Sequence, residues 1–278
     1  MNIALSPDQV ACLGVFDSGV GGLTVLRELR RQLPAVPLRY VADTAHAPYG
    51  QRSSAFITER SLAIGQHLID HGARLLVVAC NTATAHAIHA MRQRWPGLPI
   101  VGTEPGIKPA VAASHGGRIG VLATPATIAS ARYQALLARH AGAAQIFSQP
   151  CPGLADLIET GELESAALRE LLATLCAPLR AAGVDTVLMG CTHYPLIQPL
   201  LEAELGPTVQ LLNIEAAVAQ QAARLWAGLD LPAAAGRLDL ETSGDPEELT
   251  RFVQRALGWQ DVGAERLTMV PRTGLEPV

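Results

Sequence analysis

The 278-residue chain has few aromatic residues and no paired cysteines. Aromatic side chains make up 4% of it, and its five cysteines are widely spaced, with no CxxC pair. An odd number of separated cysteines argues against a disulfide framework and favours a reducing compartment. A chain of this length can bury enough apolar surface to fold without disulfide bonds.

The sequence also lacks the features that are typical of proteins that bind membranes or nucleic acids. No apolar run reaches the roughly 18 residues that a membrane-spanning helix needs, and the first residues lack the basic start and apolar core of a signal peptide. The formal net charge is −4, and no long basic run occurs. Neither a membrane nor a nucleic acid is therefore expected as a partner. We expect a cytoplasmic protein that acts on a small molecule.

Short apolar runs alternate with helical repeats along the chain. Strands are expected near residues 13–16, 38–41, 74–79, 99–102, 118–123, 144–148, 185–189, 209–212 and 237–242. Helices are expected near residues 23–33, 53–71, 82–94, 125–140, 153–160, 164–182, 215–227 and 246–257, with another from Tyr194. This alternation predicts βαβ units, an α/β fold and mostly parallel sheets.

A weak internal repeat divides the chain into two similar halves. Cys191 follows Cys80 at nearly the same separation as Thr124 follows Asp17, and all four come at the ends of expected strands. The expected parts are a first α/β domain over 12–106 completed by 215–258, a second α/β domain over 107–214, a leader over 1–11 and a tail over 259–278. The tail is proposed because no strong period follows residue 262.

Two cysteines occupy matching positions in these halves. The runs 76–80 (LVVAC) and 187–191 (VLMGC) each place a cysteine where a buried strand should end and a helix begin. A thiol at a helix N-terminus is expected to have a pKa below its usual value of about 8.5. His193 can hydrogen-bond near Cys191, and Asp17 can do so near Cys80 if the first and third strands are neighbours.

The glycines that follow Asp17 allow more than one interpretation. A GxGxxG fingerprint starting at Gly19 requires glycine where Thr24 stands, so an ordinary dinucleotide site is not expected. Glycines at a helix start can still bind an anion through backbone N–H groups. They can equally form a tight turn between a strand and a helix.

Other uses of the cysteines fit less well. A Cys-x-His pair at 191 and 193 is poor metal-ligand spacing, so no metal site is expected. A Cys-His hydrolase would use His193 as the base for Cys191 but would leave Cys80 without a role. The remaining cysteines, at positions 12, 151 and 176, are interpreted as structural.

Two similar thiols in related halves suit the inversion of a stereocentre. One thiolate removes the α-proton from one face while the other thiol delivers a proton to the opposite face, and the reverse reaction exchanges these roles. The α-proton of an amino acid is weakly acidic. The site must therefore stabilise a carbanion, with backbone N–H groups and hydroxyls in a cleft that excludes water.

Five motifs within residues 12–258 resemble those of the glutamate racemases, in the aspartate/glutamate racemase superfamily. They are GVFDSGVGGL at 14–23, PYG at 48–50, ACNTA at 79–83, GTEP at 102–105 and GCTHYP at 190–195. The resemblance implies two pseudo-symmetric, flavodoxin-like domains with mostly parallel sheets and an active site in the cleft between them. It also implies that neither pyridoxal phosphate nor a metal nor any other cofactor is used.

The resemblance further implies roles for individual residues. Cys80 corresponds to the base that acts on D-glutamate and Cys191 to the base that acts on L-glutamate. The residues that would assist them in catalysis are Asp17, His193 and Glu159. The implied substrate contacts are Asp17, Ser18, Tyr49, Gly50, Asn81, Thr82, Thr124, Thr192 and His193.

The expected function is the cofactor-independent racemisation of L-glutamate to D-glutamate for peptidoglycan precursor synthesis in cell-wall biogenesis. Two alternatives stay open: a racemase of the same superfamily acting on aspartate or another substrate, and a non-catalytic amino-acid sensor or regulatory binding protein. The leader is longer than in the shortest members, as in some relatives that need a cell-wall precursor as activator. Such an activator and a homodimer are the further partners left open.

Overall fold

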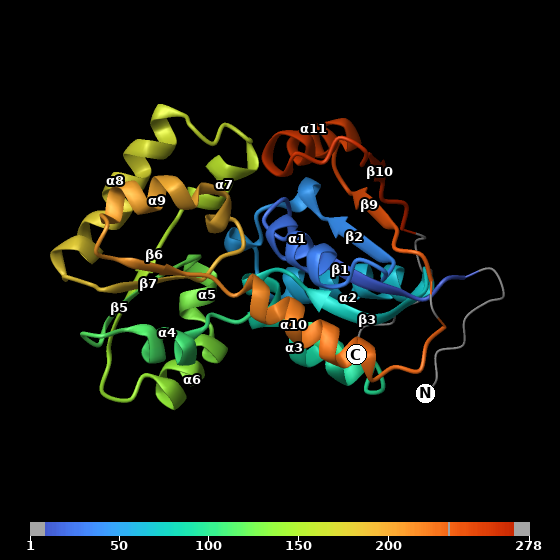
Figure 1. The fold of residues 1–278 in the computed structure, drawn as a ribbon, viewed down its shortest axis with the longest axis horizontal. Coiled ribbons are helices and arrows are strands. Elements are labelled where there is room, and N and C mark those ends of the chain that lie inside the picture. The colour runs from blue at the N-terminus through green and yellow to red at the C-terminus, as the bar shows by residue number, and fades with distance from the viewer. Residues whose placement is uncertain (1–8, 233, 270–278) are drawn as a thin grey trace.

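The computed structural model describes residues 9–232 and 234–269 of the chain. In this part of the protein the strands form one six-stranded and one four-stranded sheet, and all strand pairs are parallel. Each sheet with its helices forms a lobe, and the two lobes lie side by side (Figure 1). We call the lobe of the six-stranded sheet the first lobe and the other the second lobe.

The first sheet has the strand order β10-β9-β2-β1-β3-β4. Its strands are β1 (Cys12–Asp17), β2 (Leu38–Ala42), β3 (Ala73–Val78), β4 (Ile100–Gly102), β9 (Leu238–Thr242) and β10 (Ala264–Arg266). The helices of this lobe are α1 (Leu23–Gln32), α2 (Ser54–Asp70), α3 (Asn81–Arg94), α10 (Glu215–Ala227) and α11 (Pro246–Leu257). β1 is buried on both faces, as in a parallel sheet with helices on either side. α1 and α10 pack on one face, and α2 and α3 on the other.

The second sheet has the strand order β6-β5-β7-β8. Its strands are β5 (Arg118–Ala123), β6 (Gln145–Pro150), β7 (Thr186–Met189) and β8 (Gln210–Leu212). The helices of this lobe are α4 (Ile107–Ala113), α5 (Pro125–Ala129), α6 (Ala131–His140), α7 (Leu154–Glu159), α8 (Ala166–Ala181) and α9 (Gln198–Leu205). Three short 3₁₀ turns are η1 (Thr44–His46) and η2 (Tyr49–Gln51) in the first lobe and η3 (Tyr194–Ile197) in the second. Over the described residues, no helix has both the length and the apolar character needed to cross a membrane.

The expected α/β class with parallel sheets is confirmed, whereas several local features differ from the expectation. The helix expected over 125–140 is two helices, because Ser130 leaves the helical conformation and its Oγ accepts the Tyr133 N–H at 3.1 Å, capping α6. α4 was not expected. Residues 264–266, which we assigned to a tail, pair in register with β9 as an edge strand too short to show a period.

The leader and the tail expected from the sequence lie partly outside the described residues. Residues 1–8 of the expected leader and 270–278 of the expected tail are not described. The domain limits drawn from sequence, 12–106 with 215–258 and 107–214, stay a prediction.

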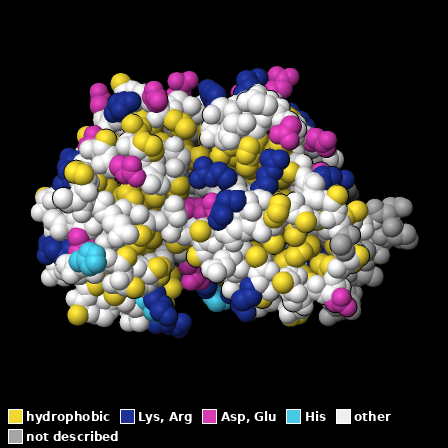
Figure 2. Space-filling view, in the orientation of Figure 1, with side chains coloured by type: hydrophobic (Ala, Val, Ile, Leu, Met, Phe, Trp, Pro, Cys, Tyr) yellow, Lys and Arg dark blue, Asp and Glu magenta, His cyan; other side chains and the backbone are white. Residues whose placement is uncertain are grey.

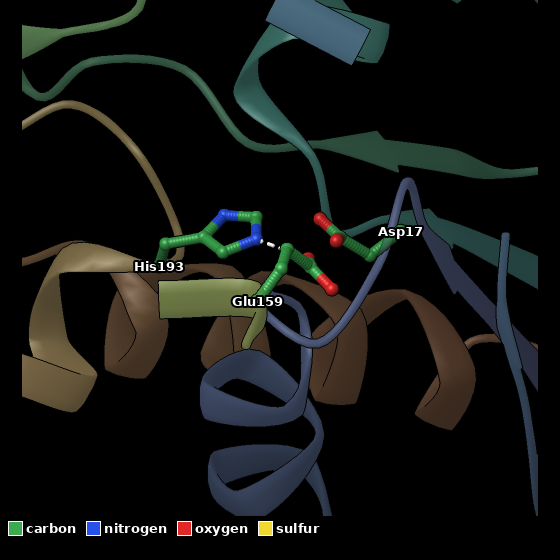
Figure 3. A group of neighbouring side chains, drawn as sticks. All are labelled: Asp17, Glu159 and His193. Carbon is green, nitrogen blue, oxygen red and sulfur yellow. Dashed lines mark hydrogen bonds and ion pairs between the residues drawn. The ribbon is translucent and has the colours of Figure 1, made fainter. Parts of the chain in front are cut away.

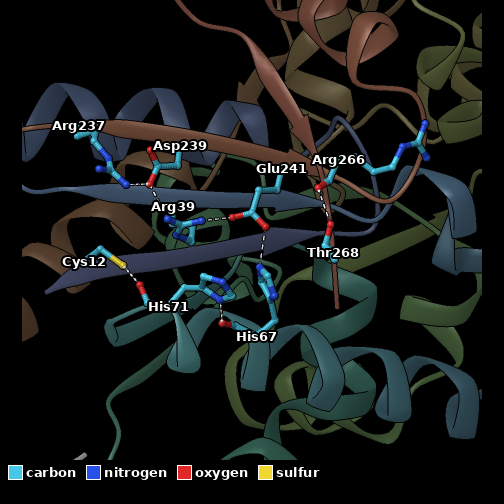
Figure 4. Close-up of polar contacts among 9 residues, drawn as sticks. All are labelled: Cys12, Arg39, His67, His71, Arg237, Asp239, Glu241, Arg266 and Thr268. Atoms are coloured by element: carbon cyan, nitrogen blue, oxygen red, sulfur yellow. Dashed lines mark hydrogen bonds and ion pairs between the residues drawn. The ribbon is translucent and has the colours of Figure 1, made fainter. Parts of the chain in front are cut away.

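Charged side chains hold β9 beside β2 in the first sheet (Figure 4). Arg39 of β2 donates to Asp239 at 2.8 Å and also pairs with Glu241, both of β9. His67 of α2 lies 2.6 Å from the other Glu241 oxygen. Burial alone would raise the pKa of Glu241, but His67 and Arg39 hold it below its usual value. This network ties a strand from near the C-terminus to the N-terminal part of the sheet.

Candidate active site

Polar side chains meet where strand ends of the two lobes approach each other. Asp17 ends β1, Cys80 follows β3 and Cys191 follows β7, and all three are buried. β1 and β3 are parallel neighbours, so Asp17 and Cys80 come to the same edge of the first sheet. Thr192 Oγ1, from the second lobe, donates to Asp17 Oδ2 at 3.2 Å. The structure therefore brings the residues singled out from sequence together from both lobes.

Cys80 is the N-cap of α3. Its sulfur accepts the Ala83 N–H at 3.4 Å, and its thiol points to Ser18 Oγ at 3.7 Å. The helix start led us to expect a lowered pKa, and this expectation was wrong. Burial, followed by the charge of Asp17, raises the pKa of Cys80 well above its usual value. In this state Cys80 is a neutral thiol with a proton to give.

Cys191 lies in a tight turn and not at the start of an α-helix, which corrects the helix expected from Tyr194. The Tyr194 N–H donates to the Cys191 carbonyl at 3.1 Å, η3 follows, and α9 begins only at Gln198. The Cys191 sulfur lies 3.5 Å from Nδ1 of His193. The imidazole, and not a helix dipole, is therefore its nearest charge partner.

His193 lies between a thiol and a carboxylate. Its Nε2 is 2.5 Å from Glu159 Oε1, which also accepts the Val20 N–H at 2.9 Å (Figure 3). Burial alone would lower the pKa of His193, but Cys191 and Glu159 raise it well above its usual value. The imidazolium form of His193 is therefore favoured beside the Cys191 sulfur.

Asp17 completes this group from the first lobe. Its Oδ1 accepts the Gly19 N–H at 2.7 Å. Burial raises its pKa above the usual value, while the charge of His193 and the bond from Gly19 act in the opposite direction. A carboxyl group with a raised pKa in a buried site can hold a proton during part of a reaction.

The same group has spacing that could hold a metal ion. One ligand atom each from Asp17, Glu159 and His193 lies within 4.8 Å of the others. However, His193 already uses Nε2 on Glu159 and Nδ1 on Cys191, so both ring nitrogens have protein partners. We therefore interpret this group as a hydrogen-bonded charge network.

Glycines allow the backbone of the loop after β1 to approach this network closely. A Cβ atom added at Gly21 would overlap the His193 imidazole, and one at Gly19 would overlap the Glu159 carboxylate. The glycine cluster is thus explained by close packing between the lobes.

Hydroxyl and amide groups form another wall of the site. Thr82 of α3 lies 3.0 Å from Thr124, oxygen to oxygen, and Thr124 caps α5 through the Thr127 N–H at 3.2 Å. Asn81 donates to the Thr103 carbonyl at 3.3 Å, while its buried Oδ1 has no partner among the residues that the structure describes. An unpaired buried acceptor of this kind can receive a hydrogen bond from a ligand.

The segment at Tyr49 and Gly50 approaches the second lobe, where a Cβ at Gly50 would lie 3.2 Å from Thr124. The Tyr49 hydroxyl donates to Asp43 Oδ2 at 2.6 Å, and Arg60 donates to both oxygens of Asp43 at 3.0 and 2.5 Å. The Tyr49 hydroxyl proton is therefore used by Asp43, and its oxygen can act toward a ligand only as an acceptor. We did not anticipate Asp43 or Arg60 from sequence, although Asp43 stands directly after a strand like the other site residues.

A cavity of about 710 Å³ lies beside the site. It is bounded by Val20 and Glu159 and by Leu249, Phe252 and Arg255 of α11. On the face shown in Figure 2, basic and hydrophobic side chains occur together where the lobes meet. The hydrogen bond from Thr192 to Asp17 crosses between the two lobes near this cavity.

Two parallel sheets that each bring one buried cysteine to their common boundary define a two-lobed α/β protein with a shared site. Residues 13–222 match the family model described as Asp/Glu/Hydantoin racemase. The glutamate racemase of Pseudomonas paraeruginosa is 49% identical over 255 residues, which cover 91% of this chain and 96% of that protein. That of Ectopseudomonas mendocina is 49% identical over 254 residues, with 90% and 96% covered.

Solved structures give the same result. A glutamate racemase isoform of Bacillus anthracis superposes with a TM-score of 0.84 at 30% identity, covering 93% of this chain and 98% of that one. The Escherichia coli glutamate racemase, in complex with L-glutamate and the activator UDP-MurNAc-ala, gives 0.83 at 32% identity, covering 94% and 100%. The chain belongs to the Asp/Glu/Hydantoin racemase family.

Proposed function

We propose that this protein is a cofactor-independent glutamate racemase that uses Cys80 and Cys191 as its two acid–base groups. The observation that carries this proposal is the pair of buried cysteines, one after β3 of the first lobe and one after β7 of the second, beside residues Asp17 and Thr192 that are hydrogen-bonded to each other across the lobes. Each has its own acidic or basic neighbour, Asp17 for Cys80 and His193 for Cys191.

In the direction from L- to D-glutamate, the Cys191 thiolate takes the α-proton while imidazolium His193 supports the thiolate. The neutral Cys80 thiol then gives its proton to the opposite face of the α-carbon. The reaction leaves Cys191 as thiol and Cys80 as thiolate, which is the arrangement needed for the reverse direction. The raised pKa of Cys80 suits the role of proton donor in this step.

The substrate is held by polar groups around the sulfurs. Ser18, Asn81, Thr82, Thr124 and Thr192 offer hydroxyl and amide groups for its carboxylates and ammonium group. The N–H groups at the start of α3 face the sulfur of Cys80 and add positive potential where the carbanion develops. Gly50 lets the segment after Pro48 approach Thr124 closely.

Glutamate is the proposed substrate because the similar proteins from Pseudomonas and Escherichia coli carry that activity in their names, at up to 49% identity over most of the chain. The product would enter peptidoglycan precursor synthesis in the cytoplasm. The activator bound in the Escherichia coli structure makes a cell-wall precursor a candidate effector here as well.

The test is chiral turnover by purified protein without added cofactor. Circular dichroism should show L-glutamate losing its signal as the racemate forms, and L-aspartate should keep its signal under the same conditions. Turnover of aspartate alone would replace the substrate assignment. No turnover of either acid, combined with measurable binding of glutamate, would favour an amino-acid sensor.

A further inference from the structure

Tyr194 carries a buried hydroxyl that the mechanism above does not use. Its side chain has no exposed surface, and its hydroxyl forms no aligned hydrogen bond with any described group. Burying a hydroxyl without a partner costs about 1–3 kcal/mol. An unpartnered hydroxyl beside a proposed catalytic group is therefore a candidate hydrogen-bond donor to that group.

The turn that carries Cys191 also sets the position of Tyr194. The Tyr194 N–H donates to the Cys191 carbonyl at 3.1 Å, so the two side chains leave the same tight turn. The hydroxyl lies close to the sulfurs of Cys191 and Cys151, and all three side chains belong to one apolar cluster under the second sheet. The Tyr194 hydroxyl is therefore a second neighbour of the Cys191 sulfur, in addition to the His193 imidazole.

The two proposed catalytic cysteines differ in the groups that can donate a hydrogen bond to their sulfur atoms. Cys80 accepts a backbone N–H from Ala83 and lies beside the Ser18 hydroxyl. Among the described residues, His193 is the one group that forms an aligned hydrogen bond with the Cys191 sulfur. A thiolate at position 191 would therefore lack the second donor that position 80 has.

We propose that Tyr194 is a positioning residue for Cys191: its hydroxyl donates a hydrogen bond to the sulfur when Cys191 loses its proton. A thiolate is a stronger acceptor than a thiol, so the bond forms with the charge and favours it. The bond also fixes the direction of the sulfur lone pairs relative to the α-carbon of the substrate. The catalytic role of this hydrogen bond rests on the proposed racemase function.

Cys151 is the competing acceptor, and its chemistry does not change during the reaction. Its thiol donates to the Gln149 carbonyl at 3.3 Å. Burial raises the pKa of Cys151 to about 12, so it stays neutral. Burial and the nearby cysteine charges also raise the pKa of Tyr194 well above its usual value, so its hydroxyl keeps the proton it donates.

The test titrates the thiolate of Cys191 by its ultraviolet absorbance in Cys80→Ser protein, with Cys80→Ser/Cys191→Ser protein subtracted. Adding Tyr194→Phe should move the midpoint upward by about one pH unit, a tenfold change, as expected for a lost bond to a charged group. Placing 3-fluorotyrosine at position 194, a more acidic donor of nearly the same shape, should move it downward. This second variant decides the question if Phe prevents folding.

Two controls separate the bond from a general effect on packing. Tyr133→Phe removes another buried hydroxyl of the same lobe, which bonds Ser148 at 2.5 Å, and should leave the midpoint unchanged. Cys151→Ala removes the competing acceptor and should not move the midpoint upward. An unmoved midpoint in both position-194 variants, or an equal shift in Tyr133→Phe or Cys151→Ala, would overturn the proposal. The titration needs no turnover, so its result is independent of whether glutamate is racemised.

In the otherwise unchanged enzyme, Tyr194→Phe should lower kcat/KM for L-glutamate about tenfold at neutral pH. The alkaline part of the pH profile should recover part of this loss, because more thiolate forms there. A loss that is equal at all pH values would show a structural role only and would contradict the proposal.

Discussion

Nε2 of His193 lies 2.5 Å from Oε1 of Glu159. Through this contact a carboxylate at the end of α7 reaches the imidazole that faces the Cys191 sulfur on its other side. The carboxylate and the sulfur both favour imidazolium, and this outweighs the opposite effect of burial. Glu159 therefore influences the charge of the imidazole that lies beside Cys191 without touching the sulfur itself.

Replacing Glu159 by glutamine tests this relationship. The pKa of His193 should fall because one of its two charge partners is lost, and kcat should drop about tenfold to a hundredfold, the range for a hydrogen bond to a charged group. The pH profile of kcat for L-glutamate measures both effects. Glu162→Gln, at an exposed position in the following turn, is the control. Wild-type kcat with an unmoved pH profile would show that Glu159 has no such role.

The two-thiol mechanism makes a second prediction. Cys80→Ser and Cys191→Ser should each abolish racemisation, because a serine hydroxyl is far too weak an acid to exchange roles with a thiolate. In heavy water the newly formed enantiomer should carry deuterium at the α-carbon, read by mass spectrometry. Cys176→Ala, at a buried cysteine in the core of the second lobe, should keep the activity. Product that retains the proton of the substrate would argue against two separate bases.

Some of this site followed from sequence because it depends on strand ends. Asp17 and Cys80 both follow apolar runs, and parallel neighbouring strands bring such positions to one edge. The bond between the lobes from Thr192 to Asp17 could not be derived in this way, since it depends on how two sheets face each other. Glu159 entered only through family resemblance, because it ends a short helix that carries no signal of its own.

The pKa of Cys80 is a clearer example of a property that could not be predicted from the sequence. A position at a helix start predicts a lower pKa for a thiol. This local effect is present, because the hydrogen bond from the Ala83 N–H lowers the pKa of Cys80. Burial and the facing Asp17 have the larger effect. Both arise from packing between segments that are distant in sequence, which composition and periodicity do not report.

The close approach at Gly21 gives a third prediction. A methyl group there would overlap the His193 imidazole and push it away from Cys191. Gly21→Ala should therefore lower kcat on the order of a hundredfold, the size of effect that a displacement of about 1 Å produces at a reacting site. Gly263→Ala is the matched control, since a methyl group there meets open space. Equal kcat values for the two variants would refute the packing argument.

The contact between Arg60 and Asp43 leads to a fourth prediction. Asp43 is fully buried and bonded to both Arg60 and the Tyr49 hydroxyl, so Arg60→Leu leaves a carboxylate without its cation. The free energy of unfolding should fall by about 3 kcal/mol, as for other broken buried pairs. KM for glutamate should rise more than kcat falls, because the segment at Tyr49 loses its support.

Urea unfolding and steady-state kinetics measure these two effects. Arg52→Leu is the control, since Arg52 is exposed and donates to the His46 carbonyl at 3.2 Å, not to a carboxylate. If Arg60→Leu matched Arg52→Leu in both stability and KM, the network would have no supporting role.

Glu215 begins α10, the helix that returns the chain to the first lobe, and it is buried. One of its carboxyl oxygens has no partner within residues 9–232 and 234–269. Burial raises its pKa to about 7, although backbone N–H groups at the helix start act in the opposite direction. The folded protein therefore binds this proton more tightly than the unfolded chain does. Stability should fall as pH rises from about 4.5 to about 7 and then change no further through this group.

Glu215→Gln removes this dependence. By the size of the pKa shift, the variant should be more stable than the wild type by up to about 3 kcal/mol at pH 8 and nearly equal to it at pH 4.5. Urea unfolding of both proteins across this range measures the difference. Glu170→Gln, at an exposed position of α8, should show no such trend. A Glu215→Gln protein whose stability runs parallel to the wild type from pH 4.5 to 8 would mean that the carboxylate is ionised throughout, because its partners at the start of α10 then outweigh the cost of burial.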